Sequence, residues 1–426
     1  MRRVLIVSPY FPPSTVAGVH RARHLAKHLP AAGWEPTVLC VDEAYHTERL
    51  DPELAELLPT GIDIVKVPAL SAVRMRCFGI GDIGIRAYPY LSRAIREVVR
   101  SRKSDVVMIT GSPFYPFLLA RRVKRLLKRP VILDFQDPWV SKWGATRPPL
   151  TKAWAAHQVA KWLEPIAVNS ADFITSVSET QNDEFAMRYP KFPRDRLAAI
   201  PIGGDASDYT YLRAHPPAEQ EVIMLKDAIN ISYVGTMLPR SEPLIGAVFS
   251  AIAKIATSNE QWVRRLRLNF VGTSNQPSGF GAFTIMPLAE KYGIRNFICE
   301  IPQRVPYLQA LDLLANSNAL ILIGSDEPHY TASKIYPALL SGRPILAIFH
   351  KASSAYDVLT RSGGARVIGF DNSEELRTMT DMIANALREI ALTPQAVGSI
   401  DRSVVAGYEA SMIAARYAAI FDRLIA

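Results

Sequence analysis

Residues 2–41 read RRVLIVSPYFPPSTVAGVHRARHLAKHLPAAGWEPTVLCV, and this stretch decides the fold. A short apolar run, 4–7, is followed by a Pro-rich loop that ends at Gly18. Apolar residues then recur close to the helical period of 3.6, until Gly33 ends the helix and 37–41 predicts a second strand. The pattern indicates a β-α-β unit, which is the beginning of a parallel sheet.

The same alternation continues in two series. The first series predicts further strands at 62–67, 106–110, 131–134, 173–177 and 197–200. The second predicts strands at 229–234, 266–270, 297–301, 320–323, 345–348 and 366–370. Strands this apolar, with helical patterns between most of them, indicate parallel sheets covered on both faces. We therefore predict an α/β protein with two Rossmann-like, doubly wound domains.

A stretch rich in Gly, Pro and polar residues, 203–221, interrupts the alternation. We predict an N-terminal domain at 1–205, a linker at 206–225, a C-terminal domain at 226–403 and a C-terminal helix at 404–426. This last helix is expected to pack back toward the N-terminal domain. Because ligands of such folds bind at the carboxyl ends of strands, beside helix N-termini, we expect the chemistry in the cleft between the domains.

Charge divides unevenly along the 426 residues. Residues 1–200 hold 29 Lys and Arg against 19 Asp and Glu, and the rest of the chain holds 20 against 21. A basic first half suggests an anionic partner, such as a phosphate-bearing substrate, an anionic membrane or a nucleic acid.

Location is also suggested by composition. No apolar run approaches the roughly 18 residues that span a bilayer, and the run after Met1 is too short for a signal peptide. Three distant cysteines rule out a disulfide scaffold and fit a reducing compartment. We expect a cytoplasmic protein, with the inner face of the membrane as a candidate surface.

An apolar strand that ends in two carboxylates is the most unusual feature of the first half. Asp134 and Asp137 lie three residues apart, and strand alternation puts Asp134 and Gln136 on one face. A carboxylate in this position can bind a sugar hydroxyl or accept a proton, and the alternative is a helix cap or turn before Pro138. We favour the functional role for Asp137 and the structural role for Asp134.

Two segments of the second half suit a phosphate group. Gly235 follows the strand 229–234 and lets a ligand approach the backbone, while Arg240 in the same turn can bind an anion with two N–H groups. Ser333 is a natural N-cap, and Lys334 lies in the first turn of the helix that follows. A cation is unfavourable there unless an anion is bound, so Lys334 predicts a bound phosphate.

Two features of the first helix leave alternatives open. Gly18 begins that helix, whose N–H groups can bind a phosphate, but a simple turn glycine is equally consistent. His20, His24 and His28 recur at every fourth position, and we favour a solvated basic stripe with Arg21 over a metal site. No D-x-D motif occurs, so a metal–diphosphate site of that type is not indicated.

A basic amphipathic helix is predicted at 118–129, with Leu119, Val123, Leu126 and Leu127 as its apolar stripe. An ordinary surface helix and a contact with an anionic membrane are both consistent with it. Nucleic acid is disfavoured because no aromatic residues alternate with the charges.

These motifs in this order resemble the group 1 (GT4-like) glycosyltransferases of the GT-B fold, over nearly the whole chain. Asp134 to Trp139 resembles the Asp-Phe-Arg-Asp-Pro-Trp segment of one bacterial branch. Gly203-Gly204-Asp205 is similar to an Asn-Gly-x-Asp before the interdomain linker. The stretch from Ser333 to Pro344 looks like the donor-site helix and the strand after it.

The resemblance implies retaining transfer of a sugar from a nucleotide-diphosphate donor to a glycan or lipid-linked acceptor, without metal or other cofactor. The second domain would bind the donor and the first the acceptor. Lys334 and Arg240 would neutralise the diphosphate, with Gly18, Gly235, Thr236 and Ser333 as further candidate contacts. Asp137 and His329 are the candidate catalytic residues.

Two departures from the family pattern concern the donor site. The family usually has two Glu residues, separated by seven residues, where this chain has His329 and Pro337. Its phosphate loop is also altered, with Thr236 in the place of an Arg and Arg240 displaced. A glycosyltransferase of polysaccharide or glycolipid biosynthesis is the leading hypothesis. The alternatives are a non-catalytic GT-B binding protein and a nucleotide-sugar epimerase of similar fold.

Overall fold

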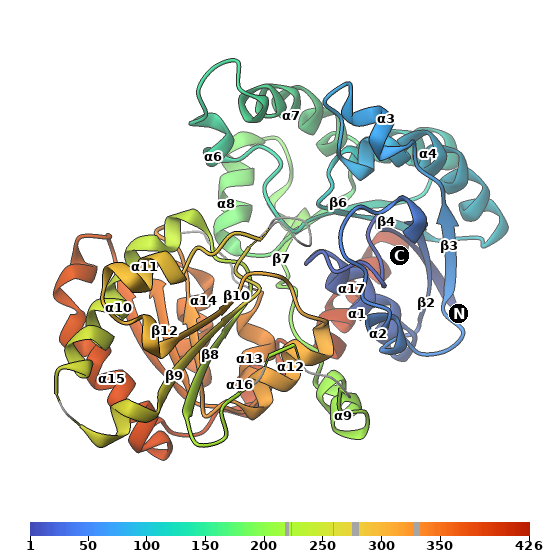
Figure 1. Ribbon diagram of the computed structural model, residues 1–426. Helices are drawn as coiled ribbons and strands as arrows, with labels where there is room; N and C mark the ends of the chain where they lie inside the picture. The colour runs from blue at the N-terminus through green and yellow to red at the C-terminus, as the bar shows by residue number, and fades with distance from the viewer. Residues whose placement is uncertain (218–220, 223, 259, 275–280, 328–332) are drawn as a thin grey trace. The chain divides into compact units, whose positions relative to one another are not determined.

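The computed structural model describes residues 1–217, 221–222, 224–258, 260–274, 281–327 and 333–426. The chain divides into two compact units (Figure 1). Unit 1 contains Met1–Ile202 and Ala410–Ala426, and unit 2 contains Gly203–Glu409.

Unit 1 is built on a seven-stranded parallel sheet with the order β3-β2-β1-β4-β5-β6-β7. Its strands are β1 Arg2–Val7, β2 Trp34–Val41, β3 Asp63–Val67, β4 Val106–Gly111, β5 Val131–Phe135, β6 Phe173–Ser176 and β7 Leu197–Ala199. Its helices are α1 Val19–His28, α2 Glu53–Glu56, α3 Ala72–Arg76, α4 Ile83–Ser101, α5 Leu119–Arg122, α6 Lys142–Ala145, α7 Lys152–Val168, α8 Glu179–Arg188 and α17 Ala410–Ile425.

Strand β1 shows why this sheet is covered on both faces. Leu5 and Val7 belong to one apolar core, which includes residues of α4. Val4 and Ile6 belong to the other core, which includes residues of α1 and α17. Since successive side chains of a strand point to opposite faces, an unbroken apolar run requires helices on both sides.

Unit 2 contains a six-stranded parallel sheet with the order β10-β9-β8-β11-β12-β13. Its strands are β8 Ile229–Val234, β9 Leu266–Val271, β10 Ile298–Ile301, β11 Ala319–Ile323, β12 Ile345–His350 and β13 Ala365–Phe370. Its helices are α9 Ala206–Ala214, α10 Glu242–Ala256, α11 Met286–Lys291, α12 Tyr307–Asn316, α13 Ile335–Leu340, α14 Ser354–Ser362, α15 Thr380–Leu392 and α16 Arg402–Ala406. Every strand predicted from the sequence is present, and the predicted α/β class with two doubly wound sheets is confirmed.

Two segments differ from the sequence-based expectation. Helix α9 occupies the first part of the expected linker 206–225, because Asp205 caps it by accepting a hydrogen bond from the Ser207 N–H at 3.0 Å. The segment 118–129 is not one amphipathic α-helix, since α5 ends at Arg122 and a π-helical turn continues it. Leu119 and Val123 are buried in the core of unit 1, so they are not part of an exposed apolar stripe.

The histidine helix also differs from expectation. Arg21, which we assigned to a solvated stripe, is fully buried and forms an ion pair with Asp134, with 3.2 Å between Nε and Oδ2. Its other guanidinium nitrogens donate to the carbonyls of Ile200 and Pro201. Burial of this arginine is tolerated because its charge is paired and its N–H groups are bonded.

Asp134 joins four elements of unit 1 to β5. Besides Arg21 of α1, its carboxylate accepts hydrogen bonds from Thr110 of β4 at 2.9 Å and Thr175 of β6 at 2.8 Å. The Tyr417 hydroxyl of α17 donates to it at 2.7 Å. Burial raises the pKa of Tyr417 well above its usual value, so this hydroxyl stays a donor. Asp134 is thus structural, as we expected, but as a buried anion and not as a cap or turn residue.

We predict that Asp134→Ala destabilises the protein by about 3–5 kcal/mol, because it leaves Arg21 as an uncompensated buried cation. Tyr417→Phe removes one hydrogen bond to a charged group and should cost about 1.5–3 kcal/mol. Urea unfolding measures both changes.

Arg423→Ala is the matched control. Arg423 also ties α17 to the rest of unit 1, through Asp195, but both side chains are more than half exposed. Its loss should cost less than about 1 kcal/mol. Equal losses for Arg423→Ala and Asp134→Ala would contradict the role that we assign to the buried carboxylate.

Candidate functional site

The carboxyl end of β8 holds the first part of the candidate site. Gly235 follows the strand directly and has φ +133°, a backbone conformation that L-residues with side chains rarely adopt. Its N–H donates to the Val271 carbonyl at 2.8 Å, which ties the turn to the end of β9. The sequence places glycine here because the turn requires this conformation.

Lys334 lies beside this turn, just before α13, which follows the neighbouring strand β11. Its ammonium donates a hydrogen bond to the Tyr233 hydroxyl, and Nζ lies 4.2 Å from the centre of the Tyr233 ring. The Tyr233 hydroxyl in turn donates to the Thr236 carbonyl at 2.9 Å. The Lys334 ammonium is thus held at the carboxyl end of β8.

Desolvation controls the charge of this lysine. Burial lowers the pKa of Lys334 from its ordinary value to about 7. An anion placed beside Nζ would favour the protonated form and raise the pKa again. Lys334 therefore has the properties of an anion-binding group whose charge depends on whether the anion is present.

Glycine at position 235 also keeps the ammonium open. A Cβ at this position would lie 3.6 Å from the Lys334 Nζ and would cover it on that side. The conformation of the turn therefore disfavours a side chain at position 235, and a side chain there would lie against Lys334.

Arg240 has a different environment from the one that we expected. Its Nε donates to Asp326 at 2.6 Å and its Nη1 to Glu327 at 2.7 Å, so two carboxylates bind the guanidinium in this structure. The hydrogen bond with Asp326 raises the pKa of Arg240 further. A phosphate would have to compete with these carboxylates, and Arg240 as a phosphate ligand stays a prediction.

Helix α13 begins later than the sequence suggested. Its N-cap is Lys334, and Ser333, which we expected to be the cap, makes no capping hydrogen bond. Pro337 lies in the first turn, where a missing N–H is tolerated. His329, a candidate catalytic residue, lies outside the residues that the structure describes.

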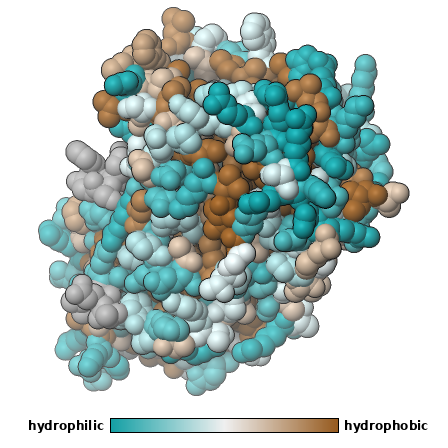
Figure 2. Space-filling model, turned by 90° about the vertical axis from the view of Figure 1, so that its right-hand side faces the viewer, coloured by the Kyte–Doolittle hydropathy of each residue, from teal (hydrophilic) through white to brown (hydrophobic). Residues whose placement is uncertain are grey.

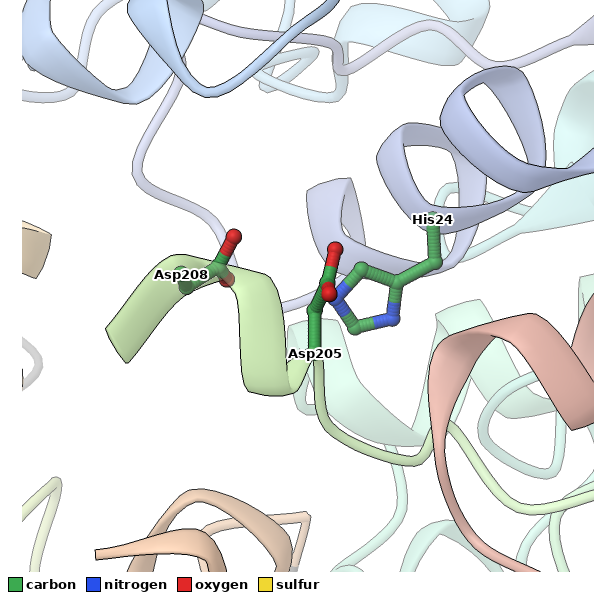
Figure 3. A group of neighbouring side chains, drawn as sticks. All are labelled: His24, Asp205 and Asp208. Atoms are coloured by element: carbon green, nitrogen blue, oxygen red, sulfur yellow. The ribbon is translucent and has the colours of Figure 1, made fainter. Parts of the chain in front are cut away.

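Helix α9 fixes the backbone around Pro337. The Tyr209 hydroxyl donates to the Pro337 carbonyl at 2.7 Å. One residue earlier, Asp208 accepts a hydrogen bond from the Tyr307 hydroxyl at 3.1 Å, and Figure 3 shows Asp208 on this helix and Asp205 at its N-terminus. Two tyrosine hydroxyls therefore hold α9 against α12 and α13.

The candidate residues of unit 1 lie at the carboxyl ends of their strands or in the loops that follow. Asp137 is exposed after β5, and its carboxylate forms no hydrogen bond or ion pair within the described part of the chain. Gly18 packs closely, since a Cβ there would meet the Ser112 carbonyl oxygen at 3.4 Å and the Gln136 Oε1 at 3.5 Å. The N–H groups of Val19 and His20 already donate to carbonyls of the preceding turn, which favours the turn-glycine interpretation of Gly18.

Tyr233 is the residue that we missed in the sequence. It is buried and both orients Lys334 and supports the turn at Thr236. Its position in an apolar strand suggested only a core residue. A polar hydroxyl two residues before a glycine turn is the signal that could have indicated it, because buried tyrosine hydroxyls need a partner.

Comparisons with known proteins agree with this architecture. Residues 17–203 match the family model described as a glycosyl transferase 4-like domain. No curated protein matches the chain.

Three solved structures illustrate the likeness of the whole chain. Sucrose-phosphate synthase from Thermosynechococcus elongatus is 13% identical, with a TM-score of 0.67, and the match covers 100% of this chain and 99% of that one. HepE from Anabaena in complex with UDP and glucose is 14% identical, with a TM-score of 0.62 and coverage of 99% and 100%. The UDP-GlcNAc 2-epimerase from Methanocaldococcus jannaschii is 12% identical, with a TM-score of 0.53 and coverage of 99% and 100%.

The structural matches cover the entire chain with two doubly wound units, which is the GT-B fold that we expected. The predicted likeness to GT4-like glycosyltransferases is confirmed by the family match in unit 1. Residues 17–203 of this chain therefore match a glycosyl transferase 4-like domain, and the chain as a whole has the GT-B fold.

Proposed function

We propose that the protein is a retaining glycosyltransferase that moves a sugar from a nucleotide-diphosphate donor to a glycan or lipid-linked acceptor. The observation that carries this proposal is the Lys334 ammonium, desolvated by burial and facing the Gly235 turn at the carboxyl end of β8. The structural likeness to HepE in complex with UDP and glucose supports a nucleotide-sugar donor.

The difficult part of this reaction is the departure of a diphosphate with full negative charge. A cation next to the leaving oxygen stabilises that charge most in a water-poor environment, where electrostatic interactions are strong. Lys334 has such an environment, and protonation on donor binding would supply the charge. Because the chain has no D-x-D motif, we propose that protein groups neutralise the diphosphate without a metal ion or other cofactor.

Asp137 and His329 are proposed to act on the transferred sugar. The Asp137 carboxylate has no hydrogen bond within the described residues, so it is available to a sugar hydroxyl or a proton. Retention of configuration follows from the likeness to the GT4-like family and is part of the proposal.

The acceptor is proposed to bind the N-terminal unit and to be anionic. Residues 1–200 carry the excess of positive charge, whereas the remainder of the chain is nearly balanced. A lipid-linked diphosphate would match this charge. With such an acceptor, the protein would work in polysaccharide or glycolipid biosynthesis at the inner face of the membrane. No helix among the described residues has the length and apolarity that a membrane span requires.

The donor site also supports a second candidate, a GT-B protein that binds without catalysis. Pro337 stands where the family has a ribose-binding Glu, and Arg240 is bound by two carboxylates. The likeness to a UDP-GlcNAc 2-epimerase keeps epimerisation as a third candidate. Incubation with UDP- and GDP-sugars, alone and with lipid-linked acceptors, separates the three candidates. A transferase moves the sugar to the acceptor, a binding protein turns over neither substrate, and an epimerase changes the sugar of the free nucleotide sugar.

We predict that the affinity for UDP or GDP falls as the pH rises above about 7. Below this pKa, Lys334 is already charged in the free protein, and above it binding must take up a proton. The affinity then declines by up to about tenfold per pH unit, the limit for one proton. Calorimetry in buffers of different ionisation enthalpy measures both the affinity and the proton uptake.

Lys334→Arg is the control for this titration. An arginine stays charged over the whole range, so this component of the pH dependence should vanish while the ionisation of the nucleotide itself remains. Lys334→Ala should weaken binding by about 1.5–3 kcal/mol at pH 6.5. The same proton uptake in the wild type and in Lys334→Arg would show that Lys334 is not the linked group.

Transfer activity is predicted to survive EDTA. Protein cations stabilise the leaving diphosphate in this proposal, so chelation should leave the initial rate within about twofold of its value without EDTA, while Lys334→Ala should lower the rate about 100-fold. Loss of activity on chelation, with recovery on adding Mn²⁺ or Mg²⁺, would overturn the metal-free mechanism.

A further inference from the structure

The surface of this protein exposes apolar side chains among hydrophilic ones, as the brown patches within teal in Figure 2 illustrate for one face. Isolated exposed apolar residues are ordinary, whereas a row of them with regular spacing needs an explanation. Helix α7 of unit 1 presents such a row.

Four apolar residues follow each other at helical spacing on the exposed face of α7. They are Ala155, Val159, Trp162 and Ile166, which we call the α7 stripe. Steps of four, three and four residues keep them on one side of the helix. Trp162 is 84% exposed, so its indole is almost wholly in solvent. The opposite side of α7, including Ala160 and Ala167, packs into the core of unit 1.

The loop just before α7 adds a further exposed apolar residue, Leu150, whose backbone conformation is unusual. Leu150 is 91% exposed and has φ +66°, the left-handed region that a bulky side chain disfavours. Thr151 fixes the loop, because its hydroxyl donates to the Pro148 carbonyl and accepts from the Trp154 N–H. Most of the surface of this leucine is therefore available to be buried by a partner.

The exposed charges of α7 are of one sign. Lys152 and Lys161 are the exposed charged residues of α7, and its one acidic residue, Glu164, is buried and bonded to the Val140 N–H and the Tyr189 hydroxyl. Helix α5 contacts α7. Further exposed cations lie on α5, on the π-helical turn that follows α5 and at the end of that turn. These are Arg121, Arg125 and Lys128.

These five cations form no ion pair with an acidic residue in the part of the chain that the structure describes. A second copy of the chain would place like charges against each other across such a face, which disfavours a dimer. An anionic bilayer offers both an apolar interior for the stripe and negative headgroups for the cations.

We propose that the α7 stripe and Leu150 dock unit 1 on an anionic lipid bilayer, with Trp162 in the interfacial region and the surrounding cations on the headgroups. This surface replaces the 118–129 segment as the apolar contact, because Leu119 and Val123 are buried. The inference refines the membrane location proposed above, but its test needs neither donor nor acceptor, so it is separate from the proposed transfer reaction.

Sedimentation of the full chain with vesicles tests the proposal. Binding is expected to vesicles of 30% phosphatidylglycerol in phosphatidylcholine and to be weak with phosphatidylcholine alone. Trp162→Ala should reduce binding about tenfold or more, and Lys152→Ala with Lys161→Ala should reduce it about 30-fold. Addition of 1 M salt should release the protein, since the Debye length falls to about 3 Å.

Matched variants in unit 2 are the controls. Phe283→Ala removes an exposed aromatic residue, and Lys291→Ala with Arg377→Ala removes two exposed cations. Neither should change vesicle binding. Brominated phosphatidylcholine should quench the fluorescence of the wild type more than that of Trp162→Phe, because Trp162 reaches the lipid.

Three outcomes would overturn the proposal: equal binding to neutral and anionic vesicles, equal binding of wild type and Trp162→Ala, or equal quenching with and without Trp162. Self-association that Trp162→Ala abolishes, without vesicle binding, would assign the stripe to a dimer. Circular dichroism of each variant shows that a loss of binding does not come from unfolding.

Discussion

The Asp134 carboxylate is the interaction on which unit 1 depends. It lies in the interior strand β5, fully buried, and accepts hydrogen bonds from α1, β4, β6 and α17. A buried carboxylate is costly unless its charge is compensated, so the positions of Arg21 and Tyr417 are constrained by it. Since Tyr417 is 283 residues away in the sequence, the last helix of the chain is required to complete a core that the first strands begin.

This dependence explains which parts of the fold could be predicted from sequence. The strands are nearly continuous apolar runs, and in such runs the period and the bounding Gly and Pro residues suffice to locate them. The sequence predicted a structural role for Asp134, but not its burial beside Arg21, because its partners come from four separate elements. Arg21 was misjudged for the same reason, since an arginine beside three histidines resembles a solvated stripe until its buried acceptors are known.

The candidate site divides in a similar way. Gly235 and Lys334 could be identified from local rules, one from the glycine after a strand and the other from a cation at the start of a helix. Tyr233 and the carboxylates on Arg240 depend on contacts between neighbouring loops of unit 2, which no local pattern contains. Ser333 was assigned as a cap from its residue type, whereas α13 begins two residues later.

The two proposals for this chain rest on the same physical rule. A charged residue that is buried, or an apolar residue that is exposed, is unfavourable unless a partner compensates for it. Lys334 is a cation with a pKa of about 7, and an anion beside it would restore its charge. Trp162 and Leu150 are apolar residues in solvent, and a bilayer would remove them from water. The compensating groups differ in kind, because a lysine facing a glycine turn accommodates a small anion, whereas a stripe along a helix of 17 residues needs an extended surface. A nucleotide diphosphate on unit 2 and a lipid surface on unit 1 would satisfy these requirements separately. Such a separation is expected if the protein, as we propose, transfers a sugar from a soluble donor to a lipid-linked acceptor.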